Sequence, residues 1–133
     1  MKLEKVAVVS KVGSKDSEQA AKDVTKKLLA KKSKVFTISP IEVEGAKQMD
    51  TLEELKKEKL DLVITLGGDG TTLRVFRNLE NETPILTINV GGNRGILAEI
   101  TIEEIDNAID QILKDNFFLD KRTRVVASCG GKE

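Results

Sequence analysis

The sequence predicts a three-layer α/β domain with a mainly parallel sheet, and two observations carry that prediction. Short apolar runs of strand length alternate with amphipathic segments of helical period, which is typical of a sheet covered by helices on both faces. Two of the runs lead directly into glycine-rich turns, at residues 67–70 and 90–95. Because parallel strands end at one edge of a sheet, and ligands bind outside that edge, the two turns are predicted to line one cleft.

The chain begins with a strand–helix–strand pattern. Lys5–Ser10 is a continuous apolar run of the kind found in central parallel strands. After a turn at residues 12–14, a helix is predicted over Ser17–Lys32, with one apolar stripe formed by Ala20, Ala21, Val24, Leu28 and Leu29. Lysines 26, 27, 31 and 32 complement its dipole, and a solvated helix face is favoured over a phosphate site. Lys34–Ile38 is a second strand, ended by Pro40.

The next segment is less regular. Ile41–Met49 has no clear period and is predicted to be a loop. Thr51 is predicted to start a short helix, because Glu54 stands three residues later at the capping-box position. Leu52 and Leu55 would face inward. Asp61–Leu66 is a third strand, rich in β-branched residues.

The first glycine turn follows that third strand. Its glycines permit sharply bent backbone and close approach of a ligand, and Thr71 or Thr72 is predicted to cap a helix carrying Leu73, Val75, Phe76 and Leu79. The N–H groups and dipole of a helix start favour phosphate. The predicted phosphate-binding residues are therefore Gly67, Gly68, Gly70 and Thr71.

Asp69 places a negative charge inside this predicted anion site. A carboxylate there is explained if it holds a metal ion, or accepts a proton from a hydroxyl that attacks a phosphate. The alternative is an ordinary strand-to-helix turn, since Asp and Gly are common turn residues. The pattern is neither a P-loop nor the GxGxxG dinucleotide fingerprint.

A fourth strand, Ile85–Asn89, leads into the second glycine turn. The candidate ligand-binding residues there are Asn89, Gly91, Gly92, Arg94 and Gly95. Whether Asn89 caps or binds, and whether Arg94 binds or is an ordinary surface residue, stays open. A strong helix is then predicted, capped by Thr101 with Glu104 at the capping-box position, and carrying Ile102, Ile105, Ile109, Ile112 and Leu113.

The final segment suggests a second structural unit. Phe117–Leu119 and Arg124–Ala127 are predicted to be extended, and nothing after them supplies a partner. We expect residues 1–119 to form an N-terminal nucleotide-binding domain, and residues 120–133 to begin a β-rich domain or form a loose tail. A strand at Arg124–Ala127 with an unpaired edge would be prone to aggregation, or would become ordered only by pairing with another copy of the chain.

Composition narrows the chemistry. Twenty-two basic residues balance twenty-two acidic ones, and four Phe are the only aromatic residues, so neither nucleic acid nor an anionic membrane is an expected partner. Histidine is absent and Cys129 is the single cysteine, which excludes a Ser–His–Asp triad, a His-ligated zinc site and an internal disulfide. Val6–Val9 is too short for a signal peptide or a membrane span, so a cytoplasmic protein is expected.

The two glycine turns together resemble those of the NAD kinases. The segments that carry the resemblance are LGGDGTTLR at Leu66–Arg74 and INVGGNRGILAEI at Ile88–Ile100. Diacylglycerol kinases share GGDGT, but the second motif favours the NAD kinases. The resemblance implies the Rossmann-like N-terminal domain of the NAD kinase and diacylglycerol kinase-like superfamily. It also implies Mg²⁺ or another divalent cation, ATP or polyphosphate as donor, NAD as acceptor, and a homo-oligomer in the full-length context.

The resemblance also implies roles for individual residues. Asp69 would contact the 2′-hydroxyl of the NAD adenosine ribose and accept its proton, Gly70 would line the same pocket, and Arg74 would contact NAD. By sequence alone, the alternative for Arg74 is an exposed helix arginine, and the ligand-binding interpretation is favoured. Ile96 stands where the family usually has Phe, which leaves any stacking there in doubt.

The family's second domain, which helps to hold the adenine, has no counterpart in these residues. The chain alone is therefore expected to be a poor kinase. Two other functions stay open: a lipid kinase of the diacylglycerol type, and a nucleotide-binding module that is inactive without its second domain.

Overall fold

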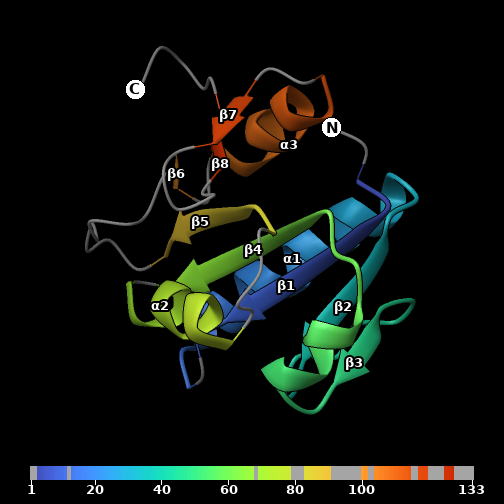
Figure 1. The fold of residues 1–133 in the computed structure, drawn as a ribbon, viewed down its shortest axis with the longest axis vertical. Coiled ribbons are helices and arrows are strands. Elements are labelled where there is room, and N and C mark those ends of the chain that lie inside the picture. The colour runs from blue at the N-terminus through green and yellow to red at the C-terminus, as the bar shows by residue number, and fades with distance from the viewer. Residues whose placement is uncertain are drawn as a thin grey trace.

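The computed structural model describes residues 3–11, 13–67, 69–78, 83–90, 100–101, 104–114, 117–119 and 125–127. Along the chain, β-strands are interspersed with helices (Figure 1). Their bounds are β1 Lys5–Ser10, α1 Lys15–Ala30, β2 Lys34–Ile38, β3 Lys47–Met49, the 3₁₀ helix η1 Leu52–Lys57, β4 Leu62–Gly67, α2 Asp69–Asn78, β5 Ile85–Asn89, β6 Ile100–Thr101, α3 Ile105–Leu113, β7 Phe117–Leu119 and β8 Val125–Ala127. None of the helices described here is long and apolar enough to cross a membrane.

A parallel sheet runs through the centre of the molecule. In the described part of the chain its strands lie in the order β3-β2-β1-β4-β5-β6, and every pairing between neighbours is parallel. β1 is internal, so Val8 lies opposite Thr37 on one side and Ile64 on the other. This order is that of a doubly wound dinucleotide-binding sheet, and the prediction of a mainly parallel sheet is confirmed.

The sheet separates two hydrophobic cores because successive side chains point to opposite faces. Val6 and Val8 face the core that also contains buried residues of α1 and α3. Ala7 and Val9 face the other core, with buried residues of η1 and α2. Figure 1 shows α1 behind the sheet and α2 and η1 in front of it. The three-layer arrangement predicted from the sequence is therefore confirmed.

The first helix and the 3₁₀ helix begin at capping residues. The Ser14 hydroxyl accepts a hydrogen bond from the Ser17 N–H at 3.2 Å, so α1 starts two residues earlier than predicted. At η1, the Glu54 carboxylate accepts the N–H groups of Asp50 and Thr51 at 2.7 and 3.3 Å. The sequence-based start at Thr51 is thus confirmed, although the helix is 3₁₀ rather than α.

Two short strands were not predicted. β3 lies within the segment expected to be a loop, and it forms because Phe36–Ile38 of β2 pair with it. β6 includes Thr101, whose backbone pairs with Asn89 of β5. The prediction that Thr101 caps α3 is therefore wrong: the N-cap is Glu104, and its side chain makes no capping hydrogen bond. Ile102 lies outside the described residues.

The second helix also starts earlier than expected. α2 begins at Asp69, only two residues after β4 ends, so Thr71 is inside the helix and the prediction that Thr71 or Thr72 caps it is wrong. Val75 is fully buried, as expected for the apolar stripe, whereas Leu73 is 43% exposed. Leu79 lies outside the described residues.

Two short strands near the C-terminus pair with each other. β7 and β8 pair antiparallel, with Phe118 opposite Val126, and β8 also contacts β5 and α3. The expectation that this strand orders only against another copy is therefore wrong for Val125–Ala127, because β7 supplies its partner. The boundary expected after residue 119 falls between the two paired strands and stays a prediction.

Two ion pairs join α1 to α3. Lys27 Nζ lies 2.7 Å from Asp106 Oδ1, and Lys31 Nζ lies 3.3 Å from Asp110 Oδ1. Both partners on each helix are four residues apart, which is the spacing of side chains on one helix face. Part of the predicted solvated lysine face therefore lies against a second helix.

Candidate nucleotide-binding site

The candidate site lies where the strands of the sheet end. β1 leads into α1 on one face and β4 into α2 on the other, so the crevice between these two strands is the topological switch point at which open α/β sheets bind ligands. Gly67 at the end of β4 lies opposite Asn89 at the end of β5, and the Val90 N–H donates to the Gly67 carbonyl at 3.3 Å. The two glycine turns therefore begin side by side on one edge.

Gly67 permits a close contact between two loops. Its φ is +146°, and a Cβ placed on it would lie 2.8 Å from Lys11 Cβ and 3.0 Å from Thr71 Oγ1. The Lys11 N–H also donates to the Leu66 carbonyl at 2.9 Å. A side chain at position 67 would push the β1–α1 loop away from the end of β4. Glycine at this position therefore allows the loop and the strand end to pack closely at the switch point.

The residues predicted from the first glycine turn lie in order along α2. Asp69 is the first residue of the helix, and Gly70 and Thr71 complete its first turn. Arg74 lies one turn further along the helix, because α2 begins at Asp69. Thr71 is buried. Gly68 and the predicted residues Gly91, Gly92, Arg94 and Gly95 lie outside the described part of the chain.

Two cavities open beside Arg74 at this edge. The larger, of about 460 Å³, is lined by Ile38, Ser39, Asp50, Thr51, Leu52, Glu53 and Arg74. The smaller is lined by Ser10, Lys11, Glu18, Ile38, Ser39, Pro40, Ile41 and Arg74. Arg74 is half-buried and its Nε is buried, so the interpretation of Arg74 as a simply exposed helix arginine is wrong.

Hydrogen bonds hold the cavity walls together. The Ser39 N–H donates to the Met49 carbonyl at 2.8 Å, which brings the ends of β2 and β3 together. The Thr37 hydroxyl donates to the Ile41 carbonyl at 2.8 Å. On the other side, the Gly13 N–H donates to Glu18 Oε2 at 3.2 Å. Both loops that flank Arg74 are thus tied to the sheet or to α1.

Sequence reasoning did not single out Lys11, Ser39 or Asp50. Each directly follows a strand of the sheet, so the rule that ligands bind beyond strand ends would have pointed to them. Lys11 and Ser39 follow strands that were predicted. Asp50 follows β3, a strand that the sequence pattern does not predict, so the sequence gives no indication that Asp50 lies at a strand end.

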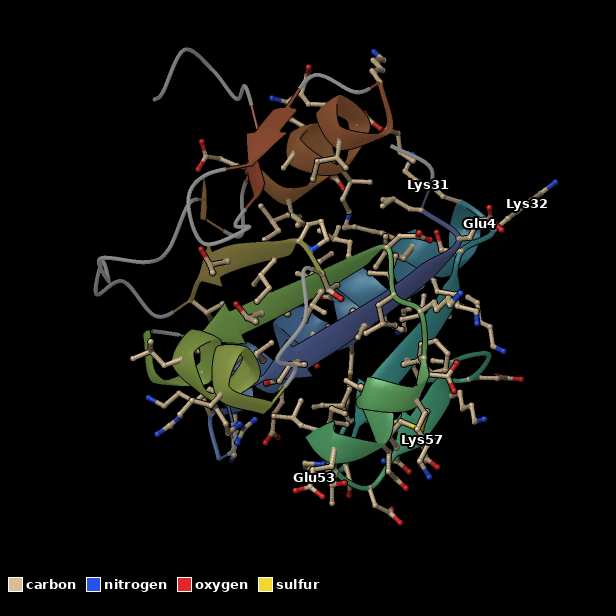
Figure 2. All side chains as sticks on the ribbon, viewed as in Figure 1. Glu4, Lys31, Lys32, Glu53 and Lys57 are labelled. Carbon is tan, nitrogen blue, oxygen red and sulfur yellow. The ribbon has the colours of Figure 1, made fainter. Side chains whose placement is uncertain are left out.

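The charges at this edge are mixed. Asp50 and Glu53 are exposed on the η1 side of the larger cavity, while Lys11 and Arg74 line the smaller cavity. In Figure 2, Glu53 lies at the lower edge of the molecule, whereas Glu4, Lys31 and Lys32 lie on its right-hand side in the upper half of the view. Among the residues described, no group of three Asp, Glu or Cys side chains is placed to hold a metal ion by itself.

The strand order defines an open, doubly wound α/β protein, and the cavities place its candidate ligand site at the carboxyl edge of the sheet. Residues 3–117 match the family model of the ATP-NAD kinase N-terminal domain. The chain belongs to this ATP-NAD kinase family.

Individual similarities agree with this assignment. The chain is 33% identical over 131 residues to NAD kinase 1 of Synechocystis sp., covering 96% of this chain and 42% of that protein. It is similar to an NAD kinase from Archaeoglobus fulgidus in complex with ATP, with a TM-score of 0.54 and 26% identity, covering 84% of this chain and 37% of that one. Yeast NADH kinase complexed with NADH shares the fold at a TM-score of 0.73 and 17% identity, over 86% of this chain and 39% of the yeast chain. The chain thus spans less than half the length of each of these proteins.

Proposed function

We propose that this chain is the N-terminal part of an NAD kinase, which transfers the γ-phosphoryl group of ATP to the 2′-hydroxyl of the NAD adenosine ribose. The observation that carries the proposal is the junction of the two glycine turns at the switch point, with Asp69 opening α2 beside it. Family membership and the ATP-bound Archaeoglobus relative support it. The named similarities are to NAD and NADH kinases, so no observation favours a lipid kinase.

The proposed reaction is an in-line displacement at phosphorus. The 2′-oxygen of the ribose forms a bond to the γ-phosphorus, and the bond from that phosphorus to the β–γ bridging oxygen breaks, which releases ADP. The hydroxyl proton passes to the Asp69 carboxylate. Catalysis of this type depends mainly on positioning and on electrostatic stabilisation, and the backbone around residues 67–71 would supply N–H groups for the phosphates. Gly70 and Arg74 would contact NAD.

Magnesium fits this site as an ion that arrives with the donor. Mg²⁺ usually keeps several waters and binds one or two carboxylates together with substrate phosphates, which matches a described region without an all-protein cluster of three carboxylates. When bound, the ion would offset the charge that develops on the transferred group. A cytoplasmic location, which is the expectation from the sequence, and a homo-oligomeric assembly, which the resemblance implies, belong to the same proposal.

The domain boundary is part of the proposal too. We expect residues 1–119 to form the nucleotide-binding domain and 120–133 to lead into the β-rich domain that the family resemblance implies. NADP formation from NAD, ATP and Mg²⁺ would be measured for this chain alone and for the chain extended by such a domain. Activity of the extended form supports the proposal. Its absence under conditions that support a relative would contradict the proposal, and an active short chain would refute the need for a second domain.

Asp69→Asn tests the role of the carboxylate in the extended form. The substitution keeps size and hydrogen-bonding capacity but cannot accept the proton, and general-base roles contribute about 10²–10⁴-fold in rate. We expect NADP formation to fall by that factor while the circular dichroism spectrum and the unfolding midpoint stay the same. A variant that retains most of its activity would show that Asp69 only shapes the turn.

A further inference from the structure

Lys11 continues a row of residues that crosses the carboxyl edge of the sheet. Gly67, the last residue of β4, pairs with Asn89 of β5. On the other side of β4, Ser10 of β1 pairs with Leu66, and the N–H of the next residue, Lys11, donates to the Leu66 carbonyl at 2.9 Å. Lys11, Gly67 and Asn89 therefore stand next to one another at the ends of three adjacent strands, where both glycine turns begin.

The side chain of Lys11 starts directly beside the first glycine turn. A Cβ placed on Gly67 would lie 2.8 Å from the Lys11 Cβ, so a glycine at position 67 leaves room for the lysine stem. α2 begins at Asp69, two residues after Gly67. Because a lysine ammonium group is carried on a flexible four-carbon stem, the Lys11 charge can reach the space in front of the first turn of α2.

The backbone of Lys11 is fixed, whereas its ammonium group is available. The Ser10 hydroxyl donates to the Lys11 carbonyl at 3.1 Å, and the Gly13 N–H donates to Glu18 Oε2 at 3.2 Å, so the loop is held on both sides of the lysine. Lys11 is exposed, and no carboxylate among the described side chains forms an ion pair with it. Its charge is therefore positioned by the fold but is not neutralised by a described neighbour.

The proposed reaction needs a positive charge at this place. Asp69 adds a negative charge at the start of α2, where a phosphoryl group would be transferred, and the helix dipole supplies only about half an elementary charge to offset it. Cationic side chains aimed at a transferred phosphoryl group stabilise the charge that develops in the transition state. Arg74 lies one turn further along α2, and the resemblance assigns it to NAD. Lys11 is the cation that the strand ends place beside the turn itself.

We infer that Lys11 is a further catalytic residue, whose ammonium group contacts the transferred phosphoryl group at the first glycine turn. The inference rests on the proposed function and adds to it a residue that lies outside both glycine motifs. It holds for any polyphosphate donor, because the terminal phosphoryl group is the same in each. Gly67 then serves the reaction as well as the fold, since the Cβ that it lacks would block the lysine stem.

The test compares three variants of the chain extended by its second domain. Lys11→Met removes the charge and keeps the stem, Lys11→Arg keeps the charge, and Lys15→Met is the matched control, because Lys15 is exposed and lines neither cavity. We expect kcat for NADP formation to fall about 10²-fold in Lys11→Met, as for the loss of one preorganised donor, while KM for NAD stays nearly constant. Lys11→Arg should recover part of this loss, and Lys15→Met should behave as the unaltered protein. All unfolding midpoints should agree.

A binding measurement separates this inference from the proposed function. In isothermal titration calorimetry with the 133-residue chain, inorganic tripolyphosphate should bind Lys11→Met about tenfold more weakly, which corresponds to about 1.4 kcal/mol, and should bind Lys15→Met unchanged. If the extended protein forms no NADP but this difference in affinity is seen, the proposed function fails and Lys11 is still a phosphate contact.

Three kinetic results with an active extended protein would overturn the inference: an undiminished kcat in Lys11→Met, an equal loss in Lys15→Met, or a loss that Lys11→Arg does not recover in any part. If the extended protein is inactive, tripolyphosphate binding that is absent, or that Lys11→Met leaves unchanged, would overturn it as well.

Discussion

Replacing Gly67 by alanine should destabilise the chain more than the same change at any glycine with open space around it. The new Cβ would lie 2.8 Å from Lys11 Cβ and 3.0 Å from Thr71 Oγ1, at a φ of +146°. A positive φ costs a residue with a side chain about 1–3 kcal/mol, and forcing an extra methyl group into a packed site costs about 1–3 kcal/mol more. We therefore expect Gly67→Ala to lower the free energy of unfolding by about 2–6 kcal/mol, a large share of the ~5–15 kcal/mol of a typical domain.

The matched control separates the two contributions. Gly13 also has a positive φ, +84°, but a Cβ there would meet nothing within 4 Å. Gly13→Ala should therefore show a conformational cost without overpacking, so Gly67→Ala should be the more destabilising of the two variants. Urea unfolding followed by circular dichroism at 222 nm measures both free energies.

A double-mutant cycle identifies the contact itself. Lys11→Gly removes the Cβ that the new methyl group would strike, so Gly67→Ala should cost less in that background, with a coupling of about 0.5–3 kcal/mol for residues in contact. If Gly67→Ala is no more destabilising than Gly13→Ala, or if the cycle shows no coupling, then close packing of Lys11 over residue 67 is not the reason that glycine is required there.

Two further predictions concern stability away from the site. Asp61→Ala should lower the free energy of unfolding by about 1–3 kcal/mol, because Asp61 Oδ2 accepts the N–H groups of Glu4 and Lys5, each at 2.9 Å; an unchanged urea midpoint would contradict this. Lys27→Ala/Lys31→Ala should cost about 0.2–1 kcal/mol per pair in dilute buffer and little in 1 M NaCl, because both ion pairs are partly exposed. Lys26→Ala is the control, and a loss that persists in high salt would show that packing rather than charge is responsible.

The central strands could be predicted because burial on both faces leaves a clear pattern in the sequence. β1, β4 and β5 read as continuous apolar runs, and the structure places them in the middle of the sheet. β3 and β6 could not be predicted, because Lys47–Met49 and Ile100–Thr101 are short and become strands only by pairing with a neighbour. Their conformation depends on tertiary contacts that a local pattern does not contain.

The candidate site divides in the same way. The glycine turn and Asp69 stand out in the sequence, because three glycines and one carboxylate are adjacent. The larger cavity does not, because Ser39 and Asp50 are brought together by the hydrogen bond from Ser39 to Met49. The predicted start of α2 was also wrong. Thr71 is a residue type that often caps helices, but the sharp turn at Gly67 lets the helix begin at Asp69.

The internal position of β1 has a consequence for synthesis on the ribosome. β2 is made soon after β1 and can cover one of its edges, but the other edge waits for β4, which ends at Gly67. Throughout the synthesis of the segment between them, a nascent chain carries an apolar strand with one unpaired edge, which is the kind of surface that pairs with other chains. Chaperones that cover exposed apolar strands would therefore matter most before Gly67 has left the exit tunnel.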